Sequence, residues 1–292
     1  MSSSSSDLSN QKESQKDTED STKQFQIPTF HPALRFFFAI LANFITFLNF
    51  SSGVVAIVLT IIDPTNTQYM LWAARLILLA IIFDFSDGIP ARLAKKEPGF
   101  FGTVVDSVAD TFSFGFAPSI MIAYSYPFTT IDTTKFLIME ILSITIGVYF
   151  GICTIYRLIR FTKTPSKKWF RGVPAPGAGC AVALYFIIKL YLENILDWKT
   201  IITPIFGLLF IVFTGTTMII SLKYPTTKLR KTPIEIFLLG LAAVVILSLV
   251  FIPLEYSIYP AGFMTALTYF YIFYGPIYLN RHMMERAEEI SE

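Results

Sequence analysis

Eight long apolar runs, separated by short polar links, occupy most of the chain. They cover residues 40–62, 70–93, 101–124, 135–161, 178–192, 201–222, 234–252 and 258–279. Most of these runs are close to the ~20 residues that a membrane-spanning helix needs. The pattern therefore predicts an all-α integral membrane protein, built as a bundle of about eight transmembrane helices.

Two different segments precede the first run. Residues 1–24 are rich in Ser, Lys, Asp and Gln and contain few large apolar residues, so we expect a disordered polar tail. Residues 25–39 are aromatic and include His31 and Arg35. This second segment is expected either to lie along the membrane interface or to begin the first helix.

The composition supports the membrane assignment. The chain is 53% hydrophobic and only 15% charged, with a mean hydropathy of +0.58, which excludes an ordinary soluble domain. Cys153 and Cys180 have no zinc-type spacing, so we expect both to be small buried packing residues. The net charge is only +2, and we expect no nucleic-acid partner.

The charges are distributed unequally between the links. Those that follow the second, fourth and sixth runs are rich in Lys and Arg, whereas the opposite links are mainly acidic. An excess of Lys and Arg marks the cytoplasmic side of a membrane protein. The basic residues are Lys95, Lys96, Lys163, Lys167, Lys168, Arg171, Lys223, Lys228, Arg230 and Lys231. With an even number of spans, both termini are then cytoplasmic.

Four aspartates lie in or at the ends of the second and third runs: Asp84, Asp87, Asp106 and Asp110. A carboxylate at membrane depth is costly and is therefore usually functional. Residues three or four apart share one face of a helix, and this is the spacing within each pair. The proline–glycine break at residues 98–99 allows the two helices to run antiparallel and to face all four carboxylates into one cavity that opens to the cytoplasm. The alternative is a set of polar residues that hold helices together.

Clustered carboxylates repel one another unless cations lie between them. Oxygen-only ligands favour a hard divalent ion, so the four aspartates predict a site for Mg²⁺ or Mn²⁺. Two ions about 3.5–4 Å apart would suit phosphoryl chemistry. Gly88, Ala91 and Gly102 lack bulk, so a ligand can approach the backbone closely.

Two arginines, Arg157 and Arg160, stand three residues apart at the end of the fourth run. Guanidinium groups bind phosphate and carboxylate oxygens with fork geometry. The charge distribution places the pair at the same membrane level as the aspartates, so we expect it to bind an anionic ligand. The alternative is two ordinary flanking residues of the cytoplasmic side.

The first run carries polar and small positions as well. Asn49 and Gly53 share one helix face, as do Asn43 and Thr46. They are expected either to form a wall of the cavity or to pack helices together.

The aspartate stretch resembles the signature of the CDP-alcohol phosphatidyltransferases, DxxDGxxAR…GxxxDxxxD. Every defined position is filled, by Asp84, Asp87, Gly88, Ala91, Arg92, Gly102, Asp106 and Asp110. The segment RLIRF…FRGVPAP, from residue 157 to residue 176, resembles the corresponding text of CDP-diacylglycerol–serine O-phosphatidyltransferases. The segment FITFLNFSSG of the first run is similar to the first helix of phosphatidylserine synthases.

The resemblance implies a catalytic helical core over residues 40–230, followed over residues 231–292 by two additional transmembrane helices and a short tail. It implies transfer of a phosphatidyl or archaetidyl group from a CDP-linked lipid to L-serine, with release of CMP. A homodimer in a prokaryotic cytoplasmic membrane is the expected setting, with membrane lipid around it.

The resemblance also implies roles for single residues. Asp84, Asp87 and Asp106 would hold two ions of Mg²⁺ or Mn²⁺, with Asp110 as a partial ligand and as the general base. The nucleotide would be bound by Asp87, Gly88, Ala91, Arg92 and Gly102. Arg157 and Arg160 would bind the lipid phosphate or the carboxylate of serine.

Two alternatives remain at this point. The acceptor alcohol can instead be glycerol phosphate, inositol phosphate or choline. A protein of another class, an ion-coupled transporter, can also carry carboxylates inside a membrane.

Overall fold

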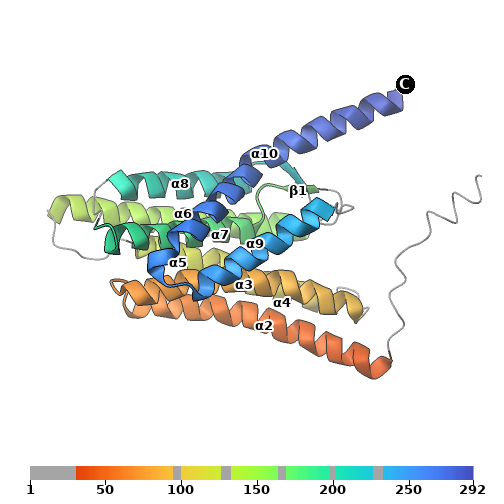
Figure 1. Cartoon of the computed structure of the whole chain (residues 1–292), viewed down its shortest axis with the longest axis horizontal. Helices are drawn as coiled ribbons and strands as arrows, with labels where there is room; N and C mark the ends of the chain where they lie inside the picture. The colour runs from red at the N-terminus through yellow and green to blue at the C-terminus, as the bar shows by residue number, and fades with distance from the viewer. Residues whose placement is uncertain are drawn as a thin grey trace, which may run out of the picture.

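The computed structural model describes residues 31–94, 100–125, 133–163, 169–197, 202–225 and 233–291. The predicted disordered tail of residues 1–24 lies outside these ranges, as do several of the basic links. The described part of the chain is a bundle of long helices with one short strand pair (Figure 1).

The first half of the bundle carries the aspartates. It consists of α2 (Pro32–Ile62), α3 (Thr67–Leu93), α4 (Phe100–Asp110), the π-helix η1 (Thr111–Phe116) and α5 (Ala117–Ala123). Helix α2 starts with a proline in its first turn, where a missing N–H costs nothing. Residues 32–39 are therefore the first turns of α2, one of the two alternatives expected for the aromatic segment.

The second half of the bundle consists of α6 (Thr133–Lys163), α7 (Ala175–Asn194), α8 (Ile202–Ile219), α9 (Pro233–Phe251) and α10 (Ile258–Ser291). A single turn of 3₁₀-helix, η2 (Leu254–Tyr256), joins the last two helices. The final turns of α10 extend beyond the rest of the bundle in Figure 1.

A short antiparallel strand pair lies at the end of the bundle where α6 and α8 finish. Strand β1 (Trp169–Arg171) pairs with β2 (Lys223–Pro225), and Phe170 lies opposite Tyr224. The side chain of Tyr224 is fully buried, and its hydroxyl donates a hydrogen bond to the carbonyl oxygen of Ile272 in α10 at 3.1 Å. This strand pair, which the apolar pattern did not predict, joins residues from before α7 and after α8 and ties α10 to the same end of the bundle.

Four helices of the described residues are long and apolar enough to cross a membrane: Ala33–Ile62, Thr67–Gly88, Leu137–Phe161 and Ala175–Asn194. Two shorter apolar helices are Ile205–Ile219 and Gly240–Phe251. The outer helices present large apolar side chains on the surface, among them Phe47 of α2 and Ile152 of α6. The protein is therefore an all-α membrane protein.

The interior of the bundle is centred on α3 and α7. Small side chains such as Ala73 and Ala74 of α3 and Ala178 and Ala183 of α7 are fully buried. Small residues allow helix backbones to approach closely, which is how helices associate inside a membrane. The predicted burial of both cysteines is confirmed.

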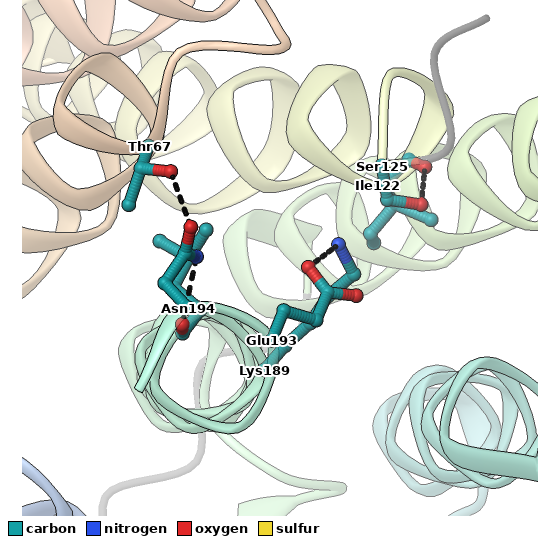
Figure 2. Close-up of polar contacts among 7 residues, drawn as sticks. Thr67, Ile122, Ser125, Lys189, Glu193 and Asn194 are labelled. Carbon is teal, nitrogen blue, oxygen red and sulfur yellow. Dashed lines mark hydrogen bonds and ion pairs between the residues drawn. The ribbon is translucent and has the colours of Figure 1, made fainter. Parts of the chain in front are cut away.

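At the end of the bundle away from the strand pair, polar contacts join the helix ends (Figure 2). The hydroxyl of Thr67 donates to Asn194 Oδ1 at 3.0 Å, which links the start of α3 to the end of α7. Lys189, which lies in an apolar run, is buried and pairs with Glu193 one turn further along at 3.0 Å. In the turn after α2, a hydrogen bond from the Thr65 hydroxyl lowers the pKa of Asp63.

Candidate active site and metal centre

Three of the four predicted aspartates form one cluster. Asp84 comes from α3, whereas Asp106 and Asp110 lie one turn apart on α4. One carboxylate oxygen from each lies within 4.8 Å of the other two, and all three residues are partly buried. The prediction that two neighbouring helices face their acidic side chains toward one another is therefore confirmed for these three residues.

Asp87 lies beside this cluster, one turn after Asp84. Its carboxylate interacts electrostatically with Asp106, and its Oδ2 accepts a hydrogen bond from the hydroxyl of Thr46 at 3.0 Å. Asp87 therefore borders the cluster and is held by α2, a helix that lies outside the signature.

A second residue of α2 contacts the cluster. Asn49 is fully buried, and its Nδ2 donates to Asp110 Oδ1 at 3.2 Å. One turn further along α2, a Cβ on Gly53 would lie 2.7 Å from the Cα of Ser113. The absence of a side chain at Gly53 thus allows α2 to contact the chain just after Asp110. Both roles left open for this face of α2 are therefore present: Thr46 and Asn49 border the aspartates, whereas Gly53 packs α2 against η1.

The helix changes type directly after Asp110. The next six residues form the π-helix η1, and α5 continues from its end. Single turns of π-helix are rare and frequently occur at functional sites. They change the direction in which the following side chains point, and Phe114 and Ala117 are fully buried. No feature of the sequence had indicated this turn.

Arg157 of α6 lies next to the cluster. Its side chain is only 7% exposed, and its charge interacts with those of Asp110 and Asp84. The guanidinium carbon is 5.3 Å from the centre of the Phe161 ring. A buried guanidinium beside partly buried carboxylates is a partner for them and can also bind an incoming anion.

Arg160 has different surroundings. Its Nη1 donates to the carbonyl oxygen of Ile219 at 2.8 Å, and its Nη2 donates to that of Met218 at 3.4 Å. Both carbonyls belong to the last turn of α8, where the helix leaves them without partners. Arg160 therefore fixes the end of α8, a contact that its spacing from Arg157 did not reveal.

The C-terminal helix α10 also reaches this region. The side chain of Tyr271 lies near Arg157, and its ring centre is 5.5 Å from that of Tyr224. The sequence had indicated only that the last two helices are additional spans outside the catalytic core. Because aromatic residues are common throughout the apolar runs, no signal distinguished Tyr271 from its neighbours.

Of the remaining signature residues, the structure describes the surroundings of Gly88 alone. Gly88 follows Asp87 on α3, and a Cβ there would meet nothing within 4 Å. Ala91 and Arg92 belong to the last turn of α3 and Gly102 to the first turn of α4. The side-chain surroundings of these last three lie outside the described part of the structure.

The cluster has the chemistry of a site for a divalent cation. If all three carboxylates are ionised, each pair within 4.8 Å repels by at least about 3 kcal/mol at an effective dielectric constant of about 20. Arg157 supplies only one positive charge against three negative ones. Oxygen ligands from carboxylates are those that hard divalent cations prefer, so these residues fit such an ion.

Comparison with known proteins agrees with this geometry. The family model for CDP-alcohol phosphatidyltransferase matches residues 39–214, a segment that includes the three clustered aspartates and both arginines. Helices α9 and α10 lie beyond the match.

Named relatives are similar over much of the chain. An archaetidylserine synthase from Methanothermobacter thermautotrophicus is 34% identical over 158 residues, 53% of this chain and 61% of that protein. A CDP-diacylglycerol–serine O-phosphatidyltransferase from Helicobacter pylori is 32% identical over 209 residues, 70% of this chain and 81% of the relative. A protein of the same name from Methanocaldococcus jannaschii is 31% identical over 214 residues, 73% of this chain and 85% of the relative. The chain belongs to the CDP-alcohol phosphatidyltransferase family.

Proposed function

We propose that this protein transfers a phosphatidyl or archaetidyl group from a CDP-linked lipid to L-serine and releases CMP. The observation that carries the proposal is the cluster of Asp84, Asp106 and Asp110, with the buried guanidinium of Arg157 beside it. The relatives named as serine phosphatidyltransferases support the choice of serine as the acceptor.

The four aspartates, with Asp87 beside the other three, would hold two ions of Mg²⁺ or Mn²⁺. When bound, such ions neutralise the diphosphate of the donor and the charge on the departing phosphate. The nucleotide would lie against Asp87 and the small positions of the signature. Those positions, with the arginine between them, are Gly88, Ala91, Arg92 and Gly102.

Asp110 is the proposed general base. It accepts the proton of the serine hydroxyl while the hydroxyl oxygen forms a bond to the phosphorus on the lipid side of the diphosphate. The bond between that phosphorus and the bridging oxygen breaks, and the electron pair leaves with CMP. Arg157 binds the lipid phosphate or the serine carboxylate. Arg160, for which the spacing had predicted the same role, instead holds the end of α8 next to this anion site.

The membrane arrangement forms part of the proposal. We infer eight spans, with the active site and both termini on the cytoplasmic side of a prokaryotic membrane, because the basic residues gather in the links at the aspartate end. Residues 40–230 would form the catalytic core, residues 231–292 would add two spans and a tail, and two copies would form a homodimer.

The test is a panel of acceptors given to the purified full-length protein in lipid vesicles. Radiolabelled serine, glycerol phosphate, inositol phosphate and choline are each supplied with CDP-diacylglycerol or its ether analogue, and CMP and labelled lipid are measured. We expect both products with serine alone, their loss in excess chelator and their return with Mg²⁺ or Mn²⁺. CMP release with another acceptor would replace serine in the proposal. Ion flux without CMP release would indicate a transporter and overturn the proposal.

A further inference from the structure

Helix α2 lies outside the eight-residue signature, yet it donates a hydrogen bond to each half of the aspartate set. Thr46 donates to Asp87 of α3, and Asn49 donates to Asp110 of α4. The two donors are three residues apart, so they share the face of α2 that is turned toward the acidic cluster. Both are neutral groups beside several carboxylates.

The position of Asn49 relative to Asp110 is fixed by three contacts. The side-chain Nδ2 reaches Asp110 Oδ1 at 3.2 Å, and the main-chain carbonyl oxygen of Asn49 accepts a hydrogen bond from the Ser113 hydroxyl at 2.7 Å. Gly53 then allows the backbones of α2 and η1 to lie in contact. Residues on both sides of the junction between α4 and η1 are thus held against one turn of α2.

The side chain of Asn49 has no other structural task in the described part of the molecule. It is 0% exposed, and its Oδ1 has no hydrogen-bond partner there. A buried amide oxygen without a partner costs free energy, so a side chain needed only for packing would be better apolar. The amide is therefore retained for the bond that its other end makes to Asp110.

We propose that Asn49 is a positioning residue, which holds Asp110 by one carboxylate oxygen and leaves the other oxygen directed to the reaction. This inference rests on the proposed function, in which Asp110 is both a metal ligand and the general base. An amide suits the task because it donates a hydrogen bond without adding charge to the cluster. Hydrogen bonds to ligating carboxylates orient them in this way in metal sites generally.

The test compares Asn49→Ala and Asn49→Ser with Ser52→Ala in the full-length protein. Ser52 is a matched control because it is buried on the same helix and, among the described residues, its hydroxyl bonds to the carbonyl oxygen of Leu48 at 2.8 Å and to no aspartate. Loss of a hydrogen-bonded partner of a metal ligand typically lowers metal affinity or activity by about 10–100-fold. The first readout is the Mn²⁺ concentration that gives half of the maximal thermal stabilisation without substrates.

For both Asn49 variants we expect the half-maximal Mn²⁺ concentration to rise at least about 10-fold and kcat to fall at least about 10-fold. At saturating Mn²⁺, their KM for CDP-lipid should stay within about threefold, because in this proposal Asn49 acts through Asp110 and not on the donor. Ser52→Ala should match the wild type in all three quantities. Mn²⁺ affinity and kcat near the wild-type values would overturn the inference, and so would failure of both variants to fold, since Asn49 would then be structural. If the wild type itself released no CMP with any acceptor, the proposed function would fail, whereas the Mn²⁺ readout would still test Asn49.

Discussion

The contact between Gly53 and Ser113 predicts a measurable effect of adding one methyl group. In Gly53→Ala, the new Cβ would lie 2.7 Å from the Cα, N and Oγ atoms of Ser113, whereas nine in ten real Cβ contacts exceed 3.4 Å. The backbone of α2 must therefore move by roughly 0.7 Å from η1. Overpacking of this kind costs about 1–3 kcal/mol, and alanine regains about 1 kcal/mol of helix propensity over glycine. The net loss of stability is expected to be at most about 2 kcal/mol.

The effect on catalysis should be larger than the effect on folding. A displacement of about 1 Å at a catalytic group can cost about 100-fold in rate, and the shift would separate Asn49 from Asp110. Gly240→Ala is the control, because a Cβ on that exposed glycine of α9 meets nothing within 4 Å. CMP release and thermal unfolding are measured for both variants. If Gly53→Ala kept kcat within twofold of the control, the argument that this contact positions the site would be refuted.

Four further substitutions test separate features of the structure. Asp110→Asn should lower CMP release by about 10²–10⁴-fold while CDP-lipid binding persists in a filter assay; normal turnover would remove Asp110 as the base. Arg157→Ala should raise the KM of one substrate at least tenfold. Arg160→Ala should mainly lower the melting temperature, because the end of α8 loses its donors. A larger KM effect from Arg160→Ala and a larger loss of melting temperature from Arg157→Ala would contradict the two roles. Gly172→Ala should lower the free energy of unfolding by about 1–3 kcal/mol, since the residue has a φ of +79° and its Cβ would collide with a carbonyl oxygen of α8. Gly262→Ala is the control, because a Cβ there meets nothing within 4 Å. Equal melting temperatures of the two variants would count against this strain.

The aspartate cluster was predictable because its geometry is mostly local. Spacings of three and four residues fix which side chains share a helix face, and a sharp break between two apolar runs brings neighbouring helices together. Asp84, Asp106 and Asp110 converge for these reasons. The positions of most helices followed in the same way, since apolar runs of sufficient length leave few alternatives inside a membrane. Helix α2, however, begins at Pro32 and not at residue 40, and α10 continues to Ser291 and not to residue 279.

The partners of the arginines were not predictable because they depend on contacts between distant helices. Helical periodicity gives Arg157 and Arg160 the same general direction. It does not say that one meets carboxylates of α3 and α4 while the other reaches the last carbonyls of α8. The height and rotation of one helix against another decide this, and neither can be read from spacing.

The π-helix after Asp110 and the position of Tyr271 near Arg157 were missed for a related reason. A π-turn contains one more residue per turn than the surrounding helix, and no residue type specifies it as glycine specifies a left-handed turn. Tyr271 belongs to a helix beyond the segment shared with the family. Its significance appears only when the fold brings α10 to the end of α6.

The charge of the site explains why metal should control donor binding as well as chemistry. The four aspartates carry a formal charge of minus four when ionised, and Arg157 reduces it to minus three. Thr46 and Asn49 add hydrogen bonds without charge. An anionic diphosphate would therefore be repelled by the residues alone, and a single divalent cation would still leave the site negative. Two divalent cations make it positive by one charge, which suits a diphosphate donor. Excess chelator should consequently abolish CDP-lipid binding even when no acceptor is present, and undiminished binding under those conditions would contradict this charge balance.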